Sequence, residues 1–390
     1  MTNHITAKLY STPRAKLALA VFLALALFAL CPGLSASDHN QQSTIISFSA
    51  PGAGTGSGQG TFALGINSHG VIVGYYLDEN YGYHGFLRSS DGSFTTFDAP
   101  GSYSGGGTLA IGLNQQGAVV GYYADANDRF HAFLRRPDGT FTTDVAPGEC
   151  RGSDFNGCNG TGAYDINDSG MIAGAYLDVN FVRNGFVLSR NGTFTSFEAP
   201  GAGNGAYQGS APDSVAGLNQ SGALSGYDLD DNNVYHSFLR DSEGNFTLLD
   251  VQGAGTSAGQ GTIAEGINDP GAIVGQYVDA SGVNHGFLWA DGNYTMFDVQ
   301  GAGTGSGQGT IPDCINTPGT IVGQYIDASS VNHGFWRTRS GNITTLDAPA
   351  AGTSAGQGTI PTDNNAAGAI TGYYVDANNV NYGFVGTSLH

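Results

Sequence analysis

Short hydrophobic runs alternate along this chain with turns rich in glycine, asparagine and aspartate. In the segment 61–99, four such runs predict strands at 61–67, 71–77, 84–88 and 94–99. The second run is apolar at nearly every position, which is typical of a strand buried on both faces. Asp91-Gly92, a two-residue hairpin signal, precedes the fourth run. The pattern predicts an all-β unit of four antiparallel strands.

The same pattern occurs seven times, and each copy has an asparagine at the end of its first predicted strand. These anchors lie 47 to 53 residues apart: Asn67, Asn114, Asn167, Asn219, Asn268, Asn316 and Asn365. Every copy has a glycine seven residues after its anchor, an aspartate eleven after and a phenylalanine nineteen after. Repeated four-stranded meanders are the signature of propeller blades. We therefore expect an all-β, seven-bladed β-propeller of four-stranded antiparallel blades.

The two ends of the chain indicate how this ring closes. The seventh copy ends after its third strand, at 384–385, and the missing fourth strand has its counterpart near the N-terminus. There the segment 45–51 (IISFSAP) matches 94–100 (FTTFDAP). A strand at 45–50 is expected to pair with the sheet formed by 359–386, because an unpaired blade edge would leave backbone groups without partners.

Three repeated positions are expected to form the core between blades. The mid-strand glycines, such as Gly74, suit a close approach by an adjacent blade. The phenylalanines pack there together with tyrosines nine residues after the anchors; stacking on a sugar is the alternative role for those tyrosines. The fourth copy differs, with Asp228 at the tyrosine position.

The run His131-Ala132-Phe133-Leu134, with Leu113-Asn114 and the glycines 117 and 121, resembles the HAF-repeat family of extracellular bacterial proteins. The corresponding tripeptide is His-Gly-Phe in three copies, His-Ser-Phe in one, Asn-Gly-Phe at 184–186 and Tyr-Gly-Phe at 382–384. The resemblance covers the whole chain after residue 36. It implies export, a bacterial source and a propeller-like fold, and it implies no activity.

Residues 1–36 are predicted to be a secretory signal peptide, and 37–390 the propeller. Three cations at positions 8, 14 and 16 precede an apolar run at 17–30, which is too short to span a bilayer comfortably. Cys31 raises the alternative of a lipoprotein, but Leu30 stands where that signal needs a small residue. Cleavage near Ala36 would give an extracellular or periplasmic protein. No later segment is apolar enough for membrane insertion.

The net charge of the chain limits the classes of molecule that it is expected to bind. With 32 acidic and 13 basic residues, the formal net charge is −19, which disfavours nucleic acid and anionic lipid. The expected partner is an extracellular ligand of unknown identity, either carbohydrate or protein.

Cys150 and Cys158 lie within one insertion and are predicted to form a disulfide in an oxidising compartment. Cys314 is expected to be a buried thiol without a disulfide partner.

A histidine six residues after the aspartate recurs in five copies, as in Asp78/His84. The favoured interpretation is structural: an Asx-turn and a cross-strand hydrogen bond. The alternative is calcium, because oxygen ligands at alternate positions begin calcium loops, although later acidic ligands are missing. No other cofactor is expected. The calcium candidates are Asp78, Asn80, Asp125, Asn127, Asp178, Asn180, Asp230, Asn232, Asp376 and Asn378.

An active site exists once, so catalytic residues should break the repeat. Four carboxylates do so on the first strands, which are expected to line the channel: Asp165, Glu265, Asp313 and Asp363. Converging carboxylates would suit a carbohydrate-active hydrolase or lyase, and a solvated acidic channel is the favoured alternative.

The insertion 149–158 is the expected partner contact. The leading hypothesis is a secreted, non-enzymatic binding or surface-structural protein; the enzyme and a calcium-stabilised structural module are the alternatives.

Overall fold

The computed structural model describes residues 44–103, 107–143, 158–212 and 217–387. All regular elements in these ranges are strands, 28 in total. Within them no helix has the length and apolar character needed to cross a membrane. The all-β prediction is confirmed.

The strands form four-stranded antiparallel groups, here called blades and named by their strands. The β2–β5 blade consists of β2 (Gly60–Ile66), β3 (Ile72–Leu77), β4 (Tyr83–Arg88) and β5 (Phe94–Phe97). The other strands are β6 (Thr108–Leu113), β7 (Val119–Ala124), β8 (Phe130–Arg135), β9 (Phe141–Thr143), β10 (Cys158–Ile166), β11 (Ile172–Asp178), β12 (Arg183–Leu188), β13 (Phe194–Phe197), β14 (Gly209–Pro212), β15 (Leu224–Leu229), β16 (Tyr235–Arg240), β17 (Phe246–Leu248), β18 (Gly261–Ile267), β19 (Ile273–Val278), β20 (Asn284–Ala290), β21 (Asn293–Phe297), β22 (Gly309–Ile315), β23 (Ile321–Ile326), β24 (Asn332–Arg337), β25 (Ile343–Leu346), β26 (Gly358–Asn364), β27 (Ala369–Val375) and β28 (Asn381–Thr387).

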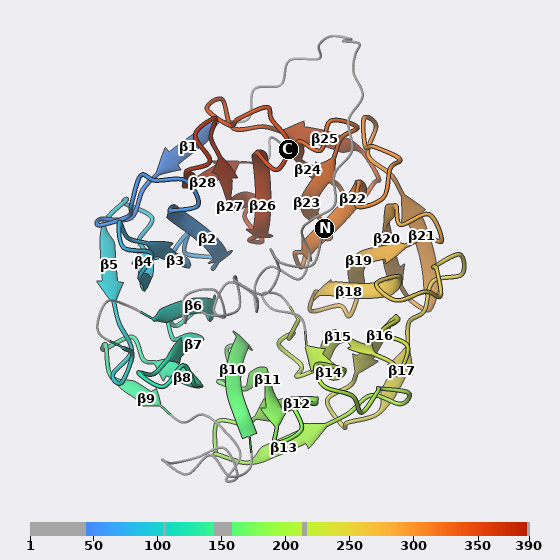
Figure 1. The fold of residues 1–390 in the computed structure, drawn as a ribbon, viewed down its shortest axis with the longest axis horizontal. Coiled ribbons are helices and arrows are strands. Elements are labelled where there is room, and N and C mark those ends of the chain that lie inside the picture. The colour runs from blue at the N-terminus through green and yellow to red at the C-terminus, as the bar shows by residue number, and fades with distance from the viewer. Residues whose placement is uncertain (1–43, 104–106, 144–157, 213–216, 388–390) are drawn as a thin grey trace, which may run out of the picture.

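The blades are arranged around a common centre (Figure 1), with the first strand of each blade innermost and the fourth at the rim. Single parallel bridges link the third strand of one blade to the first strand of the next, as between Arg183 in β12 and Gly209 in β14. A β-propeller arrangement of this kind places loops at both ends of the central axis.

The N-terminal strand β1 (Ile45–Phe48) pairs antiparallel with β28, with Ile45 opposite Gly386 and Phe48 opposite Gly383. It thus takes the fourth place in the last blade, beside β26, β27 and β28. The pairing expected for residues 45–50 is confirmed for Ile45–Phe48. Phe48 also contacts the next blade, where its ring meets Phe86 edge-on at 6.3 Å.

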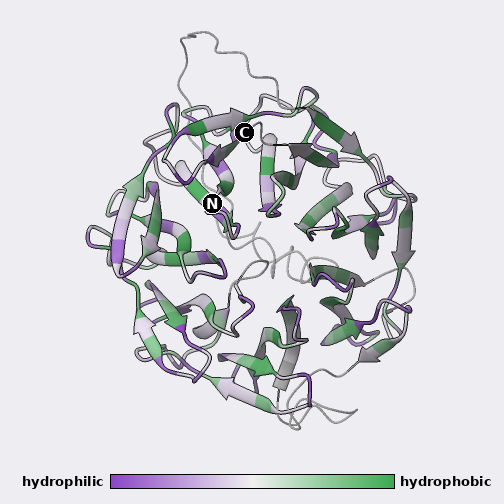
Figure 2. Cartoon of the chain, turned by 180° about the vertical axis from the view of Figure 1, so that it is seen from behind, coloured by the Kyte–Doolittle hydropathy of each residue, from purple (hydrophilic) through white to green (hydrophobic). Residues whose placement is uncertain are grey.

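The core lies between neighbouring blades. The phenylalanine nineteen residues after each anchor is fully buried in every copy: Phe86, Phe133, Phe186, Phe238, Phe287, Phe335 and Phe384. Hydrophobic residues concentrate in the strands, and hydrophilic ones in the turns (Figure 2). The packing role expected for these positions is confirmed.

The mid-strand glycines have a different role from the one expected. A Cβ atom at Gly74 would collide with the carbonyl oxygen of Phe62, which belongs to the neighbouring strand of the same blade. The first strand has an irregular register here, between Ala63 and Gly65. The close approach therefore comes from within the blade and not from the adjacent one.

Several predictions concern residues outside the described ranges. The leader 1–36 lies there, as does nearly all of the insertion 149–158 with Cys150. The backbone of Cys158 begins β10.

Candidate functional site

The anchor asparagines connect each blade to the next. The Asn67 Oδ1 atom accepts hydrogen bonds from the N–H groups of His69 and Val71 in its own turn. Its Nδ2 group donates to the Asn114 carbonyl at 3.2 Å. Equivalent bonds run from Asn114 to Asn167, then to Asn219, Asn268, Asn316 and Asn365, and from Asn365 back to Asn67. The repeat revealed these residues, but no local signal indicated the bond between blades.

The repeated aspartates hold the hairpins between the second and third strands. The Asp78 Oδ1 atom accepts hydrogen bonds from the N–H groups of Asn80 at 2.8 Å and Gly82 at 2.7 Å. Although burial opposes ionisation, these bonds lower the pKa of Asp78. The same pair of bonds forms at Asp125, Asp178, Asp230, Asp279, Asp327 and Asp376. This is the Asx-turn geometry expected for the structural interpretation.

Four of the five histidines of these pairs also bond to a second aspartate, so their clusters are larger than predicted. His84 Nδ1 bonds to Asp98 at 2.9 Å, and its Nε2 lies 3.7 Å from Asp78. The ring stacks on Tyr76 with centroids 4.9 Å apart. The hydrogen bond to Asp98 raises the pKa of His84. His236, His285 and His333 make the same bond to Asp250, Asp298 and Asp347. Sequence analysis missed these aspartates, although they recur after the fourth strand.

The aspartate–asparagine pairs make hydrogen bonds within their own turns. One carboxylate oxygen of each aspartate is held by backbone N–H groups, and the Asn232 and Asn378 amides donate to the Asp230 and Asp376 carboxylates. Among the described residues, no group of three or more His, Cys, Asp or Glu could hold a metal ion. These contacts are those of an Asx-turn, the structural interpretation of the pairs.

The four first-strand carboxylates separate into two pairs by their distance from the anchor. Asp165 and Asp363 precede their anchors by two residues, and Glu265 and Asp313 precede theirs by three. A register irregularity lies at this point of each strand. The pairs therefore occupy different positions, and the structure does not bring the four together as one site.

Asp165 and Asp363 connect adjacent blades. The Asp363 carboxylate accepts hydrogen bonds from the N–H groups of Asn364 and Ile66, each at 2.7 Å, and from the Cys314 thiol at 3.0 Å. Asp165 likewise accepts from Ile166 and from Leu218 in the next blade. Burial raises the pKa of Asp363 to about 6. Cys314 is buried and free of a disulfide, as expected.

Asp228 is the least compensated acid in the described residues. It is 0% exposed, and neither carboxylate oxygen has a hydrogen-bond partner there. It pairs with His236 across the hairpin, where the other copies with a histidine have a tyrosine stacked on the ring. Burial raises the pKa of Asp228 to about 7.

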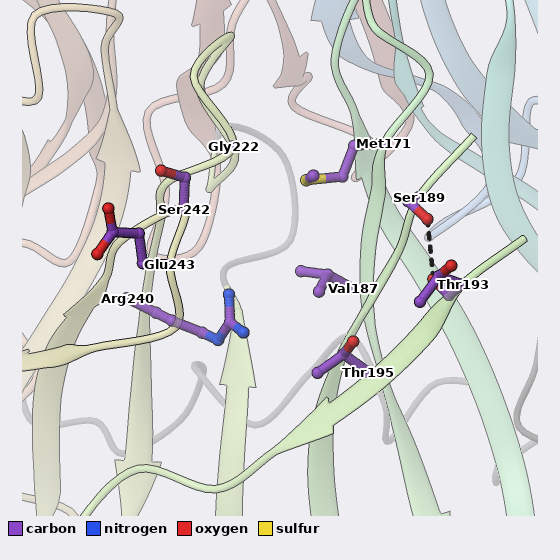
Figure 3. Close-up of a pocket in the computed structure, with 9 residues that line it drawn as sticks. All are labelled: Met171, Val187, Ser189, Thr193, Thr195, Gly222, Arg240, Ser242 and Glu243. Carbon is purple, nitrogen blue, oxygen red and sulfur yellow. Dashed lines mark hydrogen bonds between the residues drawn. The ribbon is translucent and has the colours of Figure 1, made fainter. Parts of the chain in front are cut away.

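A pocket of about 290 Å³ lies between the β10–β13 and β14–β17 blades (Figure 3). Val187, on β12, forms the floor of the pocket. Thr195, on the neighbouring strand β13, also lines the pocket. Arg240, at the end of β16, extends its guanidinium toward them, while Glu243 lies in the turn that follows. Met171 forms part of the wall. None of these residues was a candidate from the sequence. The pocket is formed by two adjacent blades, so no single copy of the repeat contains all of its residues.

The guanidinium of Arg240 is held by its own blade and the preceding one. It lies over the Phe197 ring at 5.2 Å, and Nη1 donates weakly to the Asp241 carbonyl at 3.4 Å. Around it, the side chains of Ser189, Thr193, Thr195 and Ser242 supply hydroxyl groups. The pocket combines a cation, an anion, hydroxyls and an apolar floor, which is the composition of a site for a small polar ligand.

A comparison with models of known protein families gave no match, and a comparison with curated proteins also gave none. Solved structures with a similar fold were found. The BP39L lectin from Burkholderia pseudomallei has a TM-score of 0.53 at 9% identity, over 90% of this chain and 98% of the lectin. A prolyl endopeptidase structure has a TM-score of 0.51 at 12% identity; the match covers 88% of this chain and half of that one. The Aleuria aurantia lectin, described as a six-bladed β-propeller, has a TM-score of 0.42 at 15% identity. The first two similarities, each with a TM-score above 0.5, show that this arrangement of strands also occurs in those two proteins.

Proposed function

We propose that this protein is a non-enzymatic binding propeller that acts outside the cell after cleavage of the leader near Ala36. In this proposal, seven blades form a closed ring, and one inter-blade pocket receives the ligand. The protein would be a scaffold that captures an extracellular carbohydrate or protein and leaves it chemically unchanged. We further propose that it belongs with the HAF-repeat proteins.

Two contacts support the closed ring. The β1–β28 pairing supplies a fourth strand from the opposite end of the chain. The Asn365 amide donates to the Asn67 carbonyl at 3.0 Å, so the sequence of bonds between anchors returns to its first member. An open array would have a free edge at each end, with unpaired backbone groups.

The contacts of the repeat-breaking acids support binding rather than catalysis. A general acid or nucleophile needs an oxygen that can reach the substrate. In both Asp363 and Asp165, one carboxylate oxygen accepts the N–H of the following residue, and the other accepts an N–H from a neighbouring blade. These two carboxylates therefore have a structural explanation that does not involve a substrate.

The pocket between the β10–β13 and β14–β17 blades is the observation that carries the proposal. It combines a buried cation at the end of β16 with the hydroxyl groups of Thr195, on β13, and of residues in the adjoining turns. A preformed pocket of this kind binds with little ordering cost. The BP39L protein, whose fold is similar, is a lectin, so a propeller can serve as a sugar-binding scaffold.

Retention on the immobilised mature chain, residues 37–390, tests this function. Soluble polysaccharides and extracellular proteins would be passed over the chain and over the same chain denatured and immobilised. We expect at least one polymer to be retained by the folded chain alone. Equal retention on both surfaces, or none on either, would contradict the proposal.

A second candidate function is a carbohydrate-active hydrolase or lyase. Glu265 and Asp313 favour it, because they are partly exposed and lie on the adjacent first strands β18 and β22. Asp313 adds to the effect of burial in raising the pKa of Tyr373 to about 12. Polymer cleavage that is lost in Glu265→Gln would support this alternative.

A further inference from the structure

We infer that the pocket between the β10–β13 and β14–β17 blades binds a single neutral sugar ring. This inference rests on the proposed function and names the ligand class of its site. Three features of the pocket support this assignment: its functional groups, its size, and a side chain that most other blade interfaces lack (Figure 3).

The polar groups around the pocket match a ligand that both donates and accepts hydrogen bonds. Arg240 can only donate and an ionised Glu243 can only accept, whereas the threonine and serine hydroxyls can do either. Neighbouring hydroxyl groups of a sugar can accept from the guanidinium and donate to a threonine or serine hydroxyl at the same time. A hydrocarbon ligand would leave these groups unpaired, at a cost to binding.

The charges in the pocket disfavour ionic ligands of either sign. Arg240 is less than one-tenth exposed and repels a cation, while Glu243 at the rim repels a carboxylate or phosphate. The chain as a whole carries a formal charge of −19, which further disfavours anions. A neutral polyhydroxyl ligand is the class that satisfies both groups.

The apolar surface and the volume suit one ring. Val187 and Met171 offer apolar atoms to the C–H groups of a sugar. The volume of about 290 Å³ lies near the lower limit for small-molecule pockets, so it accommodates a monosaccharide-sized group rather than a chain.

Val187 distinguishes this interface from most of the others. Four other copies have leucine at its position, namely Leu87, Leu134, Leu239 and Leu288. Val187 lies at the pocket floor in β12, so the shorter side chain leaves space where leucine would extend. Because leucine is compatible with the same register in other blades, Val187→Leu fills the pocket with little risk to folding.

Calorimetric titration of the mature chain tests the inference. The probes are the methyl glycosides of glucose, galactose, mannose and fucose, with glucuronate and glucosamine as charged counterparts. We expect one neutral glycoside to bind at one site per chain, more tightly than either charged sugar. Val187→Leu should weaken it at least about tenfold, and Thr195→Val should weaken it about tenfold through the loss of one hydrogen bond.

Thr95→Val, the equivalent change in the β2–β5 blade, is the matched control and should leave the affinity unchanged. Tighter binding of glucuronate or glucosamine would overturn the neutral-ligand assignment. Binding that persists in Val187→Leu would overturn the site but leave the binding function intact. If no probe binds, the inference fails, and polymer retention by the same chain then separates its failure from failure of the proposed function.

Discussion

Asp78 and Asp228 show how the surroundings of one residue type determine its effect on stability. Asp78 receives two backbone N–H groups, which favour its ionised form. Asp228 is fully buried without a hydrogen-bond partner among the described residues, and burial raises its pKa to about 7. The same carboxylate therefore stabilises one hairpin and destabilises another when ionised.

Asp78→Ala should lower the free energy of unfolding by about 1–2 kcal/mol, because two N–H groups of the hairpin lose their acceptor. Chemical denaturation measures the change, with Glu79→Ala, at an exposed neighbour, as control. EDTA should not shift the melting temperature of the unmodified chain. A fall of many degrees on chelation would favour the calcium-stabilised module instead.

Asp228→Tyr should raise the melting temperature, more at pH 8 than at pH 5. The folded-state pKa of about 7 exceeds the unfolded value of about 4, so the folded chain holds a proton that the unfolded chain loses. Its stability should fall as the pH rises from about 4 to about 7. The substitution also restores the aromatic residue of the other copies.

Asp228→Asn separates charge from packing in this test. It should flatten the dependence of stability on pH without filling the space of a tyrosine ring. His236, which bonds to Asp250, titrates beside Asp228 and would remain in both variants. An unchanged pH profile in Asp228→Asn would contradict this account of the buried carboxyl.

The strands themselves could be predicted closely from the sequence. The expected first strand at 61–67 is Gly60–Ile66 in the structure, and the expected fourth at 94–99 is Phe94–Phe97. Seven copies show which positions are shared, so the hydrophobic pattern and the turn signals could be compared between copies. The phenylalanine core followed from the same comparison.

The first-strand carboxylates could not be placed in this way. A register irregularity adds one residue to the first strand, so Asp363 and Asp313 occupy different positions although both precede an anchor closely. The acceptor role of Asp363 toward Ile66 depends on the neighbouring blade. Spacing within one copy contains no information about such a contact, and this also explains why the pocket was missed.

Asn167→Asp tests the bonds between anchors. Aspartate keeps the acceptor for the turn at Met171 but loses the Nδ2 donor to the Asn219 carbonyl. It also places a charge at a buried position. We expect a loss of about 1–3 kcal/mol in the free energy of unfolding, measured by denaturant titration. Asn191→Asp, at an exposed turn, is the control. Equal stability of the two variants would contradict a role of this bond in holding blades together.

At the scale of the whole molecule, the proposed ring closure rests on β1, a strand of only four residues. Deletion of residues 37–49 removes β1 and with it the contacts of Phe48 with Phe86, Phe94 and Arg88. The melting temperature should fall by several degrees or more, because the β28 edge and one aromatic core lose their partner. Deletion of 37–43 alone, which leaves β1 in place, should have little effect. Equal melting temperatures of the two truncated chains would contradict closure by β1.

The central functional claim is that the protein binds its ligand without cleaving it. The most direct measurement follows the molecular mass of any retained polysaccharide by size-exclusion chromatography during prolonged incubation with the mature chain. We predict that the polymer keeps its mass and that the bound fraction is recovered intact. Progressive shortening of the polymer that is abolished by Glu265→Gln or Asp313→Asn would contradict the account and identify the protein as an enzyme.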